Sequence, residues 1–291
     1  MRKDKRVLMS EGRYKYNTQH YIDEGMEGLS LLEKTIPLCL YSAYVKERKP
    51  LSLLISAPPG TGKSELLMKF SENKGVAVFN QGTRYGIYKQ INDLGYNLKH
   101  LIIPDLSAVL GAHPGIASDL INLISILVEE GITSVQTYYF WRTFNPPLKV
   151  GVLCAVSDSD LKSHKTRLSR TGFLSRFLPF TYSYDKHMLD RVLGYVRRGD
   201  ILKEEKIRLN LPDQVVDVQC DPKYVDQFTE FTKLEGMEQR EARFLEHIRI
   251  LLKSNALMNG RTEVNGQDVL DVMKLVIFLN YKYNVIGSNP L

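Results

Sequence analysis

Hydrophobic and polar positions follow two different periods along the first 184 residues. Residues 25–50 carry apolar side chains at helical spacing and close in charged residues and a proline, which predicts a helix. Continuous apolar runs of strand length then recur at 51–56, 75–80, 99–106 and 148–157. Helical spacing occupies segments between them, at 60–73, 84–96 and 118–131. Strands that alternate with helices predict an α/β fold with a parallel sheet covered on both faces.

The pattern changes near residue 185. From Asp185 onward the chain is mostly helical in character, with one extended interruption at 206–219. There is no internal repeat and no low-complexity linker. We therefore expect three parts: an N-terminal extension, an α/β core and a smaller, mostly helical domain, at residues 1–22, 23–184 and 185–291.

The first apolar run leads directly into a glycine-rich loop, SAPPGTGKSELL at 56–67, which is followed by a helical segment. The loop matches a phosphate-binding loop in every fixed position except the first, where Ala57 replaces glycine. Lys63 would reach the β- and γ-phosphates and Ser64 would bind Mg²⁺, while backbone N–H groups surround the phosphates. The strand before the loop and the helix after it disfavour a coincidental glycine turn. The predicted ATP-binding residues are Pro59, Gly60, Thr61, Gly62, Lys63, Ser64 and Glu65.

A carboxylate that helps to hold Mg²⁺ is expected at the end of a neighbouring strand, and LIIPDL supplies Asp105. Asp105 could instead only cap a helix that begins at Ser107. Leu106 comes next, where many ATP-hydrolysing proteins have a glutamate that activates water. We therefore expect slow hydrolysis, unless Glu129 or Glu130 supplies the missing base.

These motifs resemble those of AAA+ ATPases, and more narrowly the branch of the minichromosome-maintenance helicases and magnesium chelatases. The resemblance covers about residues 25–280, and APPGTGKS is its strongest element. It implies a parallel-sheet P-loop core with a smaller C-terminal helical lid, ATP and Mg²⁺ as ligands, and a homo-oligomeric ring, expected to be a hexamer.

The resemblance also assigns three catalytic residues besides Asp105. LCAVSDSD is similar to the sensor-1 segment, which points to Ser157, and GFLSRFLPF at 172–180 is similar to the arginine-finger segment, which points to Arg176. Residues 240–275 resemble the lid, with Arg243 at the sensor-2 position. Arg176 could alternatively form a surface or interface ion pair, and Arg243 could be a solvated helix residue. Arg167 and Arg170 are the reserve candidates for the finger.

An aromatic run precedes the sensor-1 strand. TSVQTYYFWRTFNPPLKVGV at 133–152 predicts a hairpin that turns at NPP, as in this branch, where the hairpin touches DNA in the pore. The candidate nucleic-acid contacts are Tyr138, Tyr139, Trp141 and Arg142. Packing inside the domain explains these aromatic residues equally well.

Composition narrows the functional classes. The net charge of +6 and pI near 9.0 suit an anionic partner such as a nucleotide or nucleic acid. No apolar run reaches the roughly 18 residues that span a bilayer, and the N-terminus lacks a signal-peptide core, so we expect a cytoplasmic protein without a membrane partner. The three cysteines form no metal or disulfide pattern.

Two functions remain open from the sequence. The first is a ring-forming ATPase that acts on DNA or on a protein client. The second is an ATP-dependent switch or assembly factor with little hydrolysis. A small-molecule kinase is disfavoured, because the LSRF and lid segments would then have no purpose.

Overall fold

The structure is a computed structural model that describes residues 27–184, 190, 197, 206–234, 241–281 and 283. The expected N-terminal extension, residues 1–22, lies outside the described residues. So do residues 185–189, at the expected start of the helical domain.

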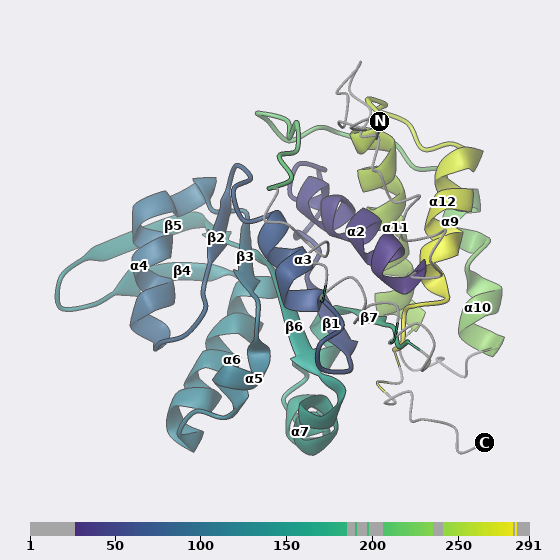
Figure 1. Ribbon diagram of the computed structural model, residues 1–291. Coiled ribbons are helices and arrows are strands. Elements are labelled where there is room, and N and C mark those ends of the chain that lie inside the picture. The colour runs from purple at the N-terminus through teal and green to yellow at the C-terminus, as the bar shows by residue number, and fades with distance from the viewer. Residues whose placement is uncertain are drawn as a thin grey trace, which may run out of the picture.

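A five-stranded parallel sheet forms the centre of the protein (Figure 1). Its strands stand in the order β2-β3-β6-β1-β7. Their bounds are Leu53–Ala57 (β1), Val76–Val78 (β2), His100–Ile103 (β3), Gly151–Ser157 (β6) and Leu178–Thr181 (β7). The apolar runs are strands because each is buried between two layers of helices, as in parallel sheets generally. The predicted α/β class is confirmed.

Each face of this sheet has its own hydrophobic core. Along β6, Leu153 and Ala155 belong to one core, whereas Val152, Cys154 and Val156 belong to the other. Helices α4 (Arg84–Leu94), α5 (Leu106–Leu110), α6 (Pro114–Val128) and α7 (Asp158–Arg170) cover the second core. Helices α2 (Glu27–Ser42) and α3 (Lys63–Lys69) cover the first, together with helices from the C-terminal region.

The C-terminal region is mostly helical, with α9 (Pro222–Asp226), α10 (Thr229–Leu234), α11 (Glu241–Met258) and α12 (Gly266–Val276). Helix α11 packs along α2, so this region closes the first core (Figure 1). Residues 206–219 contain no helix and no regular strand, and the Ile207 N–H donates to the Lys69 carbonyl at the end of α3 (2.8 Å). Helix α12 begins in a capping box formed by Asn265 and Asp268.

A two-stranded antiparallel hairpin, β4 (Ile132–Gln136) and β5 (Trp141–Leu148), precedes β6. The hairpin was predicted correctly, but its predicted turn was wrong. The chain reverses at residues 137–140, where the Thr137 N–H donates to the Phe140 carbonyl (2.9 Å), and NPP lies inside β5. Proline is tolerated there because the hairpin has only two strands, so β5 has a free edge.

Candidate functional site

The glycine-rich loop joins the carboxyl end of β1 to α3. Gly60 and Gly62 have φ of +75° and +83°, a conformation that glycine adopts without strain. Gly62 caps α3 without a side-chain hydrogen bond. The Lys63 ammonium and the Thr61 hydroxyl both donate to the Pro58 carbonyl, at 2.9 and 2.8 Å. The predicted loop residues therefore form one compact turn around the start of the helix.

The predicted magnesium residues follow β1 and β3, two strands that β6 separates in the sheet. The Ser64 hydroxyl donates to the Pro104 carbonyl (2.7 Å), the residue before Asp105. Asp105 is exposed and accepts from the Ser107 N–H (2.9 Å), so it does cap α5, the alternative raised from the sequence. An exposed carboxylate beside a serine hydroxyl fits Mg²⁺, which binds one or two protein oxygens and completes its shell with phosphate and water. No group of three or more metal-binding side chains occurs in the described residues, and such a site does not need one.

Leu106 lies on the side of the second core and is fully buried. A buried apolar side chain cannot hold a water molecule beside a phosphate. Leu106 therefore cannot act as the base that activates water.

The end of β6 adds two further carboxylates. Ser157, the sensor-1 candidate, caps α7 and donates to Asp160 (2.7 Å). Asp158 follows it and is only 9% exposed, and its Oδ1 has no hydrogen-bond partner among the described residues. Burial lowers the pKa of Lys63, and the negative charges of Asp158, Glu65, Asp105 and Asp160 act in the opposite direction. Asp158 was not selected from the sequence, because only its burial without a partner distinguishes it from its neighbours.

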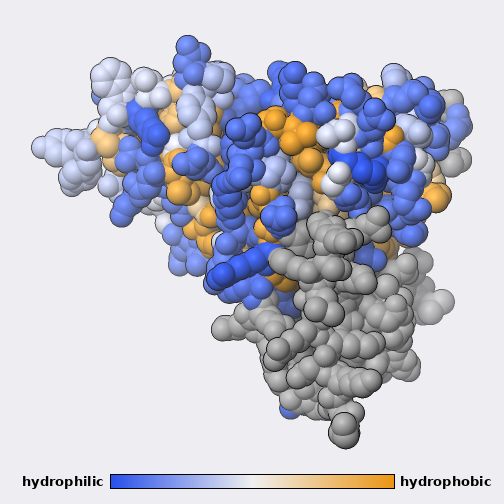
Figure 2. Space-filling view, turned by 90° about the horizontal axis from the view of Figure 1, so that it is seen from above, coloured by the Kyte–Doolittle hydropathy of each residue, from blue (hydrophilic) through white to orange (hydrophobic). Residues whose placement is uncertain are grey.

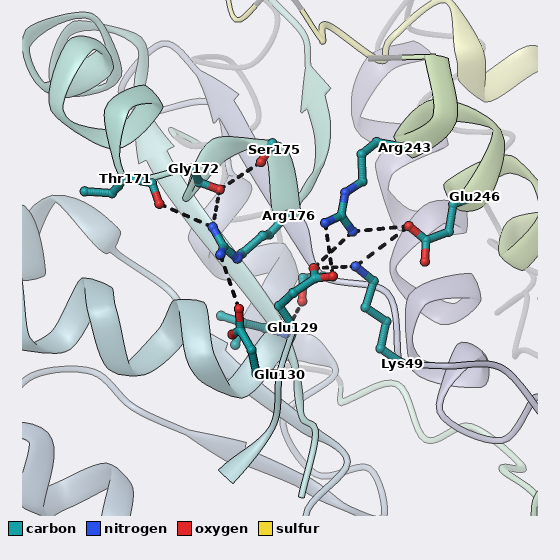
Figure 3. Close-up of polar contacts among 11 residues, drawn as sticks. Lys49, Glu129, Glu130, Thr171, Gly172, Ser175, Arg176, Arg243 and Glu246 are labelled. Atoms are coloured by element: carbon teal, nitrogen blue, oxygen red, sulfur yellow. Dashed lines mark hydrogen bonds and ion pairs between the residues drawn. The ribbon is translucent and has the colours of Figure 1, made fainter. Parts of the chain in front are cut away.

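Arg176 lies elsewhere, in the turn before β7. Its Nη1 donates to the carbonyls of Gly172 (2.6 Å) and Thr171 (3.3 Å), and its Nη2 lies 3.6 Å from Glu130 (Figure 3). Of the reserve candidates, Arg167 donates to Ser118 (2.7 Å) and Arg170 is exposed.

Arg243, at the start of α11, points toward the same region (Figure 3). Its guanidinium donates to both carboxylate oxygens of Glu129 at 3.0 Å and to Glu246 at 3.2 Å. The Lys49 ammonium also donates to Glu129, at 2.5 Å. Burial would raise the pKa of Glu129, but the hydrogen bonds from Lys49 and Arg243 outweigh burial and hold it at about 2. Arg243 therefore links α11 to the end of α6 rather than being a solvated residue.

These groups lie at the amino edge of the sheet, opposite the phosphate loop. The Val150 N–H, just before β6, donates to the Leu127 carbonyl (3.0 Å), which places Glu129 and Glu130 beside the start of β6. The loop lies beside its end, because Ala57 pairs with Ser157. Strand β6 spans seven residues, or roughly 20 Å at about 3.3 Å per residue. The hypothesis that Glu129 or Glu130 serves its own subunit's loop as a base is therefore wrong.

The hairpin carries the aromatic candidates at its tip. Tyr138, Tyr139 and Trp141 are 96%, 78% and 73% exposed, so packing does not explain them. Tyr85 on α4 contacts Tyr139 edge to face, with ring centroids 6.3 Å apart, and adds a fourth aromatic residue that the sequence analysis missed. Arg142 differs from these residues, because it donates to the Asn92 carbonyl at the end of α4. Of the four candidates, only the aromatic residues are exposed enough to contact a ligand. The hairpin projects from one end of the molecule (Figure 1), and the surface at that end is neither strongly hydrophilic nor strongly hydrophobic (Figure 2).

The sheet order and the glycine-rich loop after β1 define the class: an α/β core with a phosphate-binding loop motif. No protein-family model matches the sequence, and no curated protein matches it. Among solved structures, the fold is similar to that of a full-length MCM homolog from Methanopyrus kandleri, with a TM-score of 0.50 and 15% sequence identity. The match covers 94% of this chain and 63% of that protein. This chain thus has a fold similar to that of an MCM homolog, and it spans less than two thirds of that protein's length.

None of the helices in the described part of the chain has the length and apolar character needed to cross a bilayer.

Proposed function

We propose that this chain is an AAA+ ATPase that forms a homo-oligomeric ring, expected to be a hexamer, with ATP and Mg²⁺ bound between subunits. Residues 23–184 act as the nucleotide-binding core and residues 185–291 as the lid. Binding or slow hydrolysis of ATP would drive action on a nucleic-acid or protein client in the cytoplasm.

One observation supports this proposal: the glycine-rich loop and the candidate finger Arg176 lie at opposite edges of the same sheet. Lys63 and Ser64 belong to the carboxyl edge, whereas Arg176 belongs to the amino edge, roughly 20 Å away along β6. An arginine stabilises a transferring phosphate only in direct contact. A complete site therefore requires the loop of one subunit and the arginine of the next.

Each residue at the loop has a distinct part. Lys63 would neutralise the β- and γ-phosphates, and Ser64 with Asp105 would hold Mg²⁺. Bound Mg²⁺ would supply charge neutralisation of the phosphate oxygens. The Ser157 hydroxyl would contact the γ-phosphate region from the end of β6.

The test mixes two inactive variants, Lys63→Ala and Arg176→Ala. Lys63→Ala should lose most ATP affinity, because a charge-assisted phosphate contact is removed. Arg176→Ala should bind ATP normally and hydrolyse it about a thousandfold more slowly. Each variant alone is the control.

Mixed rings contain some interfaces where an intact Lys63 meets an intact Arg176, so mixing should restore part of the ATPase activity. If no mixing ratio restores any activity, Arg176 does not act across subunits. If Lys63→Ala binds a labelled ATP analogue as tightly as the parent, the loop is not the ATP site.

A second function is favoured by Leu106, which is fully buried where a base is expected. In that case ATP mainly holds an assembly together and recruits a partner. The isolated protein should then turn over well below about ten per second, the median for enzymes, with or without DNA. Strong stimulation by DNA would favour the ATPase over the switch.

A further inference from the structure

One buried carboxylate beside the phosphate loop, that of Asp158, has no role in the function proposed above. Strand β6 lies between β3, which leads to Asp105, and β1, which leads to the loop. In the register of β1 and β6, Ala57 pairs with Ser157, so Asp158 follows at the level of Pro58. The Pro58 carbonyl accepts the hydrogen bond of Lys63. Asp158 is therefore held near the ammonium that would meet the γ-phosphate.

The environment of Asp158 differs from that of Asp160, two residues later. Asp160 accepts from the Ser157 hydroxyl at 2.7 Å and from the Ser107 side chain. Asp158 is 9% exposed, and its Oδ1 has no partner among the described residues. A buried polar atom without a partner is rare and costly, and such atoms in native proteins commonly serve function. Burial raises the pKa of Asp158 and Lys63 lowers it, so the carboxylate is a stronger base than an exposed one.

No other carboxylate in the described part of the chain is both buried and free to act as a base near Lys63. Glu65, whose charge also acts on Lys63, is exposed. Glu129 and Glu130 lie at the opposite edge of the sheet, and Asp160 is already hydrogen bonded. Asp105 is exposed and engaged with α5. Leu106 has no polar atom on its side chain.

We infer that Asp158 is the general base of ATP hydrolysis. It would take the role that a glutamate has in many ATP-hydrolysing proteins, at the position where this chain has Leu106. This inference rests on the proposed ATPase function. The oxygen of a water molecule attacks the γ-phosphorus, and the bond from that phosphorus to the oxygen bridging the β- and γ-phosphates breaks. ADP leaves with the bridging oxygen and its electron pair. The water transfers one proton to the Asp158 carboxylate, which later releases it to solvent, and the product is inorganic phosphate.

The test compares Asp158→Asn with the parent and with Asp226→Asn, the same substitution at an exposed position on α9. Asp158→Asn should bind Mg²⁺ and a fluorescent ATP analogue with unchanged Kd. Its single-turnover rate should fall about 100- to 10,000-fold, the usual contribution of a general base. Its Tm should be unchanged or higher, because the substitution removes a buried charge whose Oδ1 has no hydrogen-bond partner among the described residues. Asp226→Asn should match the parent in all three measurements.

Two further measurements separate a base from a residue that only positions Lys63. A positioning residue would weaken ATP binding when substituted, whereas a base would lower only the rate. Asp158→Ala should regain part of its rate when formate is added, because formate supplies a carboxylate in the space left by the side chain. This rescue also tests the inference if the asparagine variant is unstable.

The outcomes distinguish this inference from the proposed function. If the parent binds no ATP, both are overturned. If the parent binds ATP but hydrolyses none in a single turnover, Asp158 as base and the ATPase proposal are both overturned, and the switch remains. If Asp158→Asn hydrolyses ATP at the parent rate, only Asp158 as base is overturned. Absence of rescue by formate together with weakened ATP binding would assign Asp158 to positioning Lys63 instead.

Discussion

Glu129→Gln should destabilise the protein more than any other single carboxylate-to-amide change at the amino edge of the sheet. Glu129 accepts hydrogen bonds from Lys49 at 2.5 Å and from Arg243 at 3.0 Å. The Lys49 side chain is only 3% exposed, and its other acidic neighbour, Glu246, is 3.8 Å away. Burial lowers the pKa of Lys49 even though Glu129 and Glu246 act in the opposite direction. Its charge therefore depends on Glu129.

Two independent routes give the size of this effect. Removing one partner of a buried ion pair typically costs about 3 to 5 kcal/mol. The pKa of Glu129 lies at about 2 instead of the ordinary 4.5, which at about 1.4 kcal/mol per tenfold change corresponds to roughly 3 kcal/mol. A loss of that size lowers the Tm by roughly 5 to 10 °C in a chain of this length.

The pH dependence has a definite sign. A depressed pKa stabilises the folded state above the ordinary pKa of 4.5, and this stabilisation is lost as the pH falls toward about 2. The difference in stability between the parent and Glu129→Gln should therefore be largest above pH 4.5 and shrink below it.

Thermal and urea unfolding, followed by circular dichroism, measure the effect. Glu130→Gln is the matched control: its side chain is 59% exposed and lies 3.6 Å from Arg176, so its loss should cost no more than about 1 kcal/mol. Equal losses of stability in the two variants would refute the reasoning, and so would a Glu129→Gln effect that does not change below pH 4.5.

Two more predictions follow from the fold. Replacing Tyr138 and Trp141 by alanine should weaken binding of single-stranded DNA by about 1 to 3 kcal/mol per stacked base, with no change in Tm. Fluorescence anisotropy measures the affinity, and an unchanged affinity would favour a protein client. Gly151→Ala would place Cβ 2.7 Å from the Leu51 carbonyl oxygen and against His100, which should cost about 1 to 3 kcal/mol in urea unfolding. Gly266→Ala, with no atom within 4 Å of the added Cβ, is the control and should be neutral.

The sequence predicts the sheet and the loop well because both depend on local patterns. The apolar runs are strands and the segment after the glycine-rich loop is a helix, since burial on both faces and the glycine conformations are encoded within a few residues. The hairpin turn was misplaced because NPP is a strong turn signal. Residues 137–140, TYYF, carry no glycine, proline or asparagine to compete with it.

The arrangement of charges at the amino edge could not be predicted in the same way. Lys49, Glu129 and Arg243 lie far apart in the sequence. The packing of α11 on α2 and the hydrogen bond that holds the end of α6 beside β6 bring them together. In the sequence, each of these three residues taken by itself is typical of a solvated charged side chain. Asp158 was missed for a related reason: the sequence shows an acidic residue at a helix start, whereas its missing partner is a property of the packed site.

The two arginines at this edge are held with very different strength, and this difference decides between them. Arg176 has one acidic neighbour, Glu130, which is 59% exposed and 3.6 Å away, so that ion pair contributes no more than about 1 kcal/mol. Its remaining contacts are hydrogen bonds to the carbonyls of Gly172 and Thr171. Arg243 makes a bidentate hydrogen-bonded ion pair with Glu129. The Glu129 side chain is 10% exposed and also accepts a hydrogen bond from Lys49. Pulling Arg243 away would leave that buried cluster short of a positive charge. Of the two, we therefore expect Arg176 to reach a neighbouring subunit's phosphate, while Arg243 keeps the lid attached to the core.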